Sequence, residues 1–150
     1  MLNCIDRHRN TPVWDRTFIT WEGEDPKAPQ RQLSYREFDA ELCRLAGALE
    51  ALGVQRGDRV GLYMPNLPET FIAFFAVLKL GAVVMPLFSG FGPQPLVARL
   101  NDGEAKVVLT VDGTWRRGSP GAMKSVLDEA LASVPSVRHV LVLRHLGDAV

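Results

Sequence analysis

From residue 59 onwards, short apolar runs alternate with segments of helical period. The runs VVMPL, KVVLTV and VLVL are almost continuously apolar, which is typical of strands that helices cover on both faces. The predicted strands are residues 59–64, 82–87, 105–111 and 137–143, and the predicted helices between them are residues 68–80, 93–101 and 120–132. Helices between successive strands require right-handed crossovers, so the pattern predicts a parallel sheet.

Proline supports the predicted start of each of these helices. Pro68, Pro93 and Pro120 stand at the first helical position, where the missing amide hydrogen would have no partner in any case. The agreement of the three prolines strengthens the predicted boundaries.

The N-terminal part of the chain follows a different pattern. Residues 16–22 are rich in aromatic and β-branched side chains, and residues 32–34 are placed to pair back on them, which predicts a β-hairpin. Ser34 and Glu37 have the spacing of a capping box, and apolar residues then recur on one helical face until Gly53. That face consists of Phe38, Leu42, Leu45, Ala46, Leu49 and Leu52.

These elements predict an α/β fold: an N-terminal β-hairpin and helix followed by a mostly parallel sheet with alternating helices. Residues 1–33 are the N-terminal segment and hairpin, of which residues 1–15 show no clear period and are expected to wrap the surface. Residues 34–150 are the α/β core. A fold that ends just after a strand at 137–143 leaves an edge strand and a sheet face without partners, so the sequence is interpreted as a fragment.

Composition and charge fit one folded domain. The chain has 150 residues, of which 47% are hydrophobic and 23% charged, as in ordinary globular proteins. Seventeen Lys and Arg balance seventeen Asp and Glu, so charge gives no support for nucleic acid or an anionic membrane as a partner. Cys4 and Cys43 form no CxxC pair, which argues against a disulfide scaffold or a sulfur-ligated zinc site.

Targeting signals are not apparent. The first ten residues are polar and charged, unlike a secretory signal, and the apolar run at 71–87 is interrupted and shorter than the roughly 20 residues that span a bilayer. A cytoplasmic location is therefore expected.

Ligands of open parallel sheets bind at the carboxyl ends of the strands, where three loops are expected, at residues 65–67, 88–92 and 112–119. In the middle loop, Gly90 and Gly92 permit a ligand to approach the backbone closely. The predicted helix that starts at Pro93 adds free amides and a positive dipole end, which stabilise an anion. A GxG pair is only part of a dinucleotide fingerprint, and glycine is also used in such turns for geometry alone.

The third loop carries Arg116 and Arg117 beside Trp115, which combines fork-shaped phosphate donors with a flat ring for stacking on a base. The alternative is a solvated surface turn, because adjacent loop arginines are common. Spacing alone favours the solvated turn, and the convergence of both loops on one sheet edge reduces that preference without reversing it.

Other candidates for chemistry are weaker. The sequence has no GxxxxGK[ST], HExxH or GxSxG motif, and Cys4 with His8 lacks a second pair at metal-ligand spacing. His139 and His145 are explained by strand packing and a loop position, and Trp21 is assigned to packing. Neither a catalytic residue nor a metal site is predicted.

Several segments together resemble one family. They are NCIDRH, FITWEGE, LSYREFDAELCRLAGALEALGVQRGDRVGLYMPNLPE, FSGFGPQPLVARLNDGEAKVVLTVDG and WRRG. Over nearly the whole chain they resemble the N-terminal part of acetyl-CoA synthetase and related acyl-CoA synthetases of the adenylate-forming, AMP-binding superfamily.

The resemblance implies a ligase that activates a carboxylic acid with ATP and Mg²⁺ to an acyl-adenylate and then transfers the acyl group to coenzyme A. The ATP phosphate loop, the magnesium carboxylate and the catalytic lysine of the family would lie beyond Val150, in the remainder of the synthetase fold. The chain by itself is therefore expected to be inactive and to contribute part of the coenzyme A site.

The resemblance assigns that site to Phe88, Ser89, Gly90 and Arg116. Residues 88–91 read FSGF in this chain, where the family commonly has FGGF, so the two differ at Ser89. The family also commonly has a basic residue where this chain has Ser119. Arg117 is a neighbouring guanidinium that would replace the lost phosphate contact.

Two alternatives stay open at this point. One is a free-standing α/β module that binds a nucleotide or another protein without catalysis. The other is the product of an interrupted reading frame that folds poorly. The acyl substrate and the oligomeric state are not encoded in a recognisable way.

Overall fold

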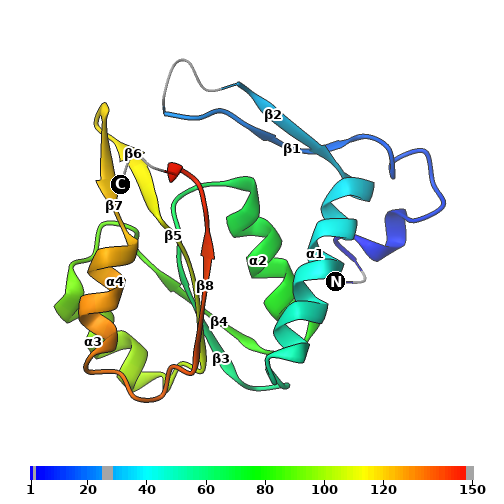
Figure 1. The fold of residues 1–150 in the computed structure, drawn as a ribbon. Coiled ribbons are helices and arrows are strands. Elements are labelled where there is room, and N and C mark those ends of the chain that lie inside the picture. Colours follow the sequence, from blue (N-terminus) through cyan, green and yellow to red (C-terminus); the bar gives the residue numbers. More distant parts are fainter. Residues whose placement is uncertain (2, 25–28, 148–150) are drawn as a thin grey trace.

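The computed structural model describes residue 1, residues 3–24 and residues 29–147. Its elements, in chain order, are η1 (Asp6–His8), β1 (Thr17–Trp21), β2 (Arg31–Ser34), α1 (Tyr35–Ala51), β3 (Arg59–Tyr63), α2 (Pro68–Lys79), β4 (Val83–Leu87), α3 (Pro93–Asp102), β5 (Val107–Val111), β6 (Gly113–Arg116), β7 (Ser119–Ala122), α4 (Lys124–Leu131) and β8 (His139–Leu143). Figure 1 shows α1 and α2 on one face of the central sheet and α3 and α4 on the other. The predicted α/β class is confirmed.

The central sheet is parallel throughout and has the strand order β4-β3-β5-β8. All five residues of β5 are buried, because β3 and β8 flank this strand and helices cover both of its faces. This explains why its sequence is apolar without alternation. The four strands predicted from the sequence agree with the observed strands to within two residues at each end.

The predicted capping box at the start of α1 is present. The Ser34 hydroxyl accepts a hydrogen bond from the Glu37 amide at 3.2 Å, and the Glu37 carboxylate accepts one from the Ser34 amide at 2.8 Å. These two contacts satisfy amides that a helix start otherwise leaves unpaired. At the other end, Gly53 has a φ of 80°, which suits glycine at a helix stop.

Most of the described residues of 1–15 lie exposed or half-buried on the surface, as predicted, but two of them insert into the protein. Ile5 and Trp14 are buried with Phe38, Leu42 and Ile72 in a second apolar cluster. Without a period to read, single apolar side chains of an irregular segment give no signal that they insert into a core.

The predicted helix start at Pro120 is wrong. Residues 113–122 form an antiparallel hairpin in which Trp115 is paired with Pro120, and α4 begins four residues later. Arg117 and Gly118 have φ values of 53° and 78°, as in the two-residue turns that match the twist of a hairpin. Pro120 is tolerated because an edge strand does not need every backbone donor. The helix starts predicted at Pro68 and Pro93 are confirmed.

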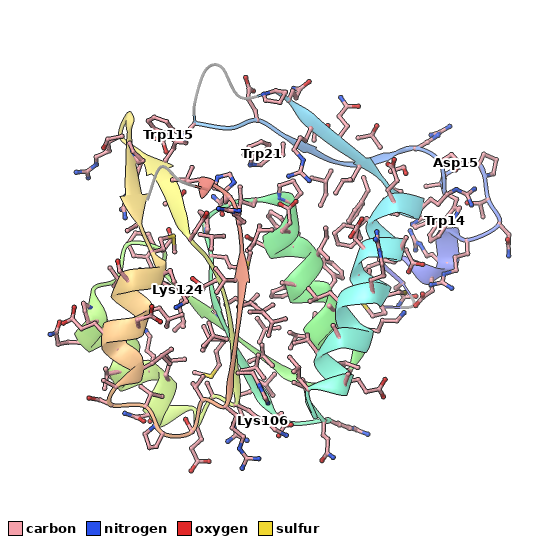
Figure 2. All side chains as sticks on the ribbon, in the orientation of Figure 1. Trp14, Asp15, Trp21, Lys106, Trp115 and Lys124 are labelled. Atoms are coloured by element: carbon pink, nitrogen blue, oxygen red, sulfur yellow. The ribbon has the colours of Figure 1, made fainter. Side chains whose placement is uncertain are left out.

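The amino ends of the strands are held by charged side chains. Lys106 Nζ lies 2.8 Å from the Asp58 carboxylate and 2.5 Å from the Gly53 carbonyl oxygen. Figure 2 shows Lys106 at the end of the sheet opposite to Trp21 and Trp115. The Asp58–Lys106 ion pair and the candidate site described below therefore lie at different ends of the strands. In the described part of the chain, no helix has the length and apolar character needed to cross a bilayer.

Candidate functional site

A cleft of about 600 Å³ lies at the carboxyl ends of the parallel strands. Five segments line it, namely the end of β1 and the residues after it, the β3–α2 loop, the β4–α3 loop, β6, and the residues after β8. The lining residues are Trp21, Glu22, Gly23, Glu24, Pro65, Asn66, Leu67, Phe88, Ser89, Thr114, Trp115, Arg116, His145 and Leu146. Figure 2 shows Trp21 and Trp115 at this end of the molecule, each carried by one of the two hairpins.

Phe88 and Arg116 come together in this cleft. The Arg116 guanidinium lies over the Phe88 ring, 5.2 Å from its centroid, and the ring is 57% exposed. A large exposed ring beside a cation is a surface on which a planar group can stack, and the guanidinium adds donors for an anion. The predicted convergence of the two loops is therefore confirmed.

Gly90 leaves the space that this arrangement needs. A Cβ atom at position 90 would lie 2.2 Å from Arg116 Nη1 and 2.6 Å from Phe88 Cε1. Any side chain at position 90 would therefore displace the guanidinium from the ring. Ser89, beside it, lines the cleft directly.

Tyr63 of β3 holds the loop that carries Phe88. The Tyr63 hydroxyl donates a 2.9 Å hydrogen bond to the Phe91 carbonyl oxygen, and the Phe88 and Phe91 rings meet edge to face at 5.6 Å. Burial raises the pKa of Tyr63, while the charge of Arg116 acts in the opposite direction. The phenol therefore stays protonated and keeps donating its hydrogen bond at neutral pH.

Arg117 is placed differently from Arg116. Its side chain is exposed and does not line the cleft, whereas its backbone amide donates a 2.6 Å hydrogen bond to Glu24 Oε1. The structure thus brings Phe88, Ser89, Gly90 and Arg116 together, and turns the Arg117 side chain outwards.

Asp112 holds two residues of the cleft lining, His145 and Leu146, in place. Its carboxylate accepts hydrogen bonds from the amides of Gly113, His145, Leu146 and Gly147, at 2.7 to 3.1 Å. Burial raises the pKa of Asp112, but these amides lower it by more, so the net pKa lies below the ordinary value. An ionised Asp112 therefore ties the residues after β8 to the end of β5.

The sequence interpretation missed several residues of this site. Trp21 and His145 were assigned to packing and to a loop, yet both line the cleft. Glu24, which no sequence signal singles out, lines it as well. The loop at residues 65–67, predicted at the carboxyl end of its strand, lines the cleft as expected.

Among the described residues, His, Cys, Asp and Glu form no group of three or more that could hold a metal ion. The cleft lining combines aromatic rings, the Arg116 guanidinium, two carboxylates, hydroxyl and amide side chains, and the His145 imidazole.

Comparisons with known proteins give the family. A model of the family described as AMP-binding enzyme matches residues 5–149.

An acetyl-coenzyme A synthetase of Mycolicibacterium smegmatis is 46% identical over 145 residues, which are 97% of this chain and 15% of that protein. The acetyl-coenzyme A synthetase of Streptomyces coelicolor is 45% identical over 148 residues, and that of Bdellovibrio bacteriovorus is 39% identical over 148 residues. In both cases 99% of this chain is covered, and 22% and 23% of the relatives. The chain therefore spans less than a quarter of the length of these relatives, and it belongs to the AMP-binding enzyme family.

Proposed function

We propose that this chain is the N-terminal part of an AMP-forming acyl-CoA synthetase of the acetyl-CoA synthetase kind. Such an enzyme activates a carboxylic acid with ATP and Mg²⁺ to an acyl-adenylate and transfers the acyl group to the thiol of coenzyme A. The match to the AMP-binding family over residues 5–149 and the names of the relatives support this proposal.

Within that enzyme, the cleft contributes to the binding of the nucleotide end of coenzyme A. The observation that carries this assignment is the Arg116 guanidinium held over the exposed Phe88 ring beside Ser89 and Gly90. Phe88 and Trp115 offer faces for the adenine ring, and Arg116 offers donors for a phosphate oxygen. The start of α3 follows the Phe88 loop and adds the positive end of a helix dipole.

The chain alone contributes binding and not turnover. No catalytic residue is assigned to it, and ATP with Mg²⁺ is used by other parts of the synthetase. Incubation of the chain with acetate, ATP and coenzyme A is expected to yield no acetyl-CoA.

Tryptophan fluorescence tests the assignment directly, because Trp21 and Trp115 line the cleft. Titration with coenzyme A is expected to quench this emission, and Arg116→Ala is expected to weaken binding about tenfold, as for loss of a charged hydrogen bond. Arg138→Ala is the matched control, because Arg138 is also exposed but precedes β8 at the opposite end of the sheet.

Dephospho-coenzyme A, which lacks the 3′-phosphate, identifies the group that Arg116 holds. If this arginine binds that phosphate, Arg116→Ala weakens coenzyme A binding and leaves dephospho-coenzyme A binding nearly unchanged. Equal coenzyme A affinities of Arg116→Ala and Arg138→Ala would contradict the assignment.

A further inference from the structure

Glu24 places a carboxylate against the tip of the β6–β7 hairpin. Its Oε1 accepts a 2.6 Å hydrogen bond from the backbone amide of Arg117, which lies 93 residues later in the chain. Glu24 also lines the cleft that contains Arg116. The contact therefore joins the two hairpins that wall the cleft.

The conformation of the turn makes the Arg117 amide available. Arg116 is paired with Ser119, so Arg117 and Gly118 form a two-residue turn, and both have positive φ. In such a turn the ladder does not use the amide of the first central residue. A backbone amide that the ladder leaves free can donate to an anion, and the Glu24 carboxylate is the anion that occupies this position.

The charges of the cleft disfavour a second anion while Glu24 stays in place. Among its described lining residues, Glu22 and Glu24 carry carboxylates and Arg116 carries the guanidinium. A phosphate that approaches Arg116 therefore meets more negative than positive charge, and like charges brought together oppose binding.

We propose that Glu24 is a built-in competitor for the phosphate of the ligand. In the unliganded protein its carboxylate occupies the anion position at the Arg117 amide, and a phosphate group displaces it on binding. This inference rests on the proposed function, because coenzyme A is the ligand whose phosphate enters. The Glu24 carboxylate lowers the affinity of the cleft for phosphate-bearing ligands. It thereby favours ligands that carry enough negative charge to displace it.

The test follows the Arg117 amide of the ¹⁵N-labelled chain by NMR during titration with inorganic phosphate and, separately, with coenzyme A. Glu24→Ala frees the amide and is expected to bind phosphate roughly threefold to tenfold more tightly than the unaltered chain. Glu24→Gln keeps a neutral acceptor, so it is expected to show a smaller gain. Glu22→Gln is the matched control, because it removes the same charge from the same cleft and leaves the Glu24 contact intact.

Three results would overturn the proposal. Weaker phosphate binding by Glu24→Ala would show that the contact positions the turn instead of competing for it. Equal gains in Glu24→Ala and Glu22→Gln would show that overall charge alone is responsible. If phosphate caused no chemical-shift change of the Arg117 amide in Glu24→Ala, this amide would not be an anion-binding position.

The two ligands separate this proposal from the proposed function. If phosphate binds more tightly to Glu24→Ala but coenzyme A binds to no variant, the competitor stands and the coenzyme A assignment fails. If coenzyme A binds equally to Glu24→Ala and to the unaltered chain, the assignment stands and the competitor fails.

Discussion

The indole nitrogen of Trp21 donates a 2.7 Å hydrogen bond to the backbone carbonyl oxygen of Asn66. This contact fixes the end of β1 to the loop between β3 and α2, 45 residues away in the chain. A second contact supports it, because Arg31 of β2 pairs with Glu69 of α2 at 2.7 Å. The N-terminal hairpin thereby becomes one wall of the cleft.

Replacement of Trp21 by Phe should loosen this wall. The variant keeps an aromatic ring but loses the donor to Asn66, so the free energy of unfolding is expected to fall by about 1 kcal/mol. Urea unfolding measures this change, and coenzyme A affinity should fall with it. Trp115→Phe is the control for the unfolding measurement, because its indole nitrogen has no hydrogen bond among the described contacts. Unchanged stability and affinity would mean that the hairpin is held by other contacts.

Gly90→Ala should displace Arg116 without unfolding the protein. The new Cβ would lie 2.2 Å from Arg116 Nη1 and 2.6 Å from Phe88 Cε1. Both side chains are exposed and can move, so the stability cost is small while the guanidinium must leave the Phe88 ring. Coenzyme A affinity is expected to fall about as far as in Arg116→Ala. Gly92→Ala serves as control, because a Cβ at position 92 has no atom within 4 Å. Equal affinities of the two alanine variants would contradict the role of Gly90.

Asp112→Asn should detach the residues after β8. An amide side chain cannot reproduce a carboxylate that accepts four backbone hydrogen bonds, so the free energy of unfolding is expected to fall by about 2 to 3 kcal/mol. Amide hydrogen exchange should rise at His145, Leu146 and Gly147. Protection that persists at these three amides would show that the strand end holds them without Asp112.

The Asp58–Lys106 pair predicts a loss of stability in acid. The hydrogen bond from Lys106, followed by that from the Gln55 amide, lowers the pKa of Asp58 in the folded state. A lowered carboxyl pKa gives stabilisation that is complete above the unfolded value of about 3.9 and disappears as the pH falls through the folded value. Urea unfolding from pH 7 to pH 3 should show a decline that begins near pH 5. The free energy of unfolding of Asp58→Asn should depend less on pH over this range. The same pH dependence in Asp58→Asn and the unaltered chain would show that the Asp58–Lys106 pair does not cause the decline.

Val142→Lys should reduce self-association. Val142 is 44% exposed on β8, which is an edge strand of the described sheet, and exposed apolar edges promote pairing between chains. A lysine at this position opposes edge-to-edge pairing, so light scattering of a concentrated sample should fall. Leu141→Lys is a poor substitute, because Leu141 packs against the core. Equal scattering of Val142→Lys and the unaltered chain would show that association, if present, uses another surface.

Local sequence signals determined most of the architecture. The continuous apolar runs identified the parallel strands, and Ser34 with Glu37 identified the start of α1, because both signals depend on neighbours in the chain. Topology then placed the Phe88 loop and the Arg116 segment at one sheet edge, since parallel strands share the edge at which their carboxyl ends lie.

The errors occurred where distant residues decide the local structure. The sequence pattern predicts a helix start at Pro120, but Arg117 and Gly118, both with positive φ, close a hairpin instead. An arginine with positive φ has no reliable sequence signature, because such a conformation is costly for a side chain and depends on its surroundings. In this turn the Arg117 amide is also held by Glu24.

The sequence by itself determined the α/β class, the parallel strands, the first three helix starts and the sheet edge at which the candidate residues meet. Only the tertiary structure decided that Trp21, Glu24 and His145 line the cleft, that Gly90 makes room for Arg116, and that Arg117 offers its amide instead of its side chain. The physical reason is the range of the interactions. Periodicity and capping act between near neighbours, whereas a cleft wall depends on hydrogen bonds such as that between Trp21 and Asn66, which exist only after the chain has folded.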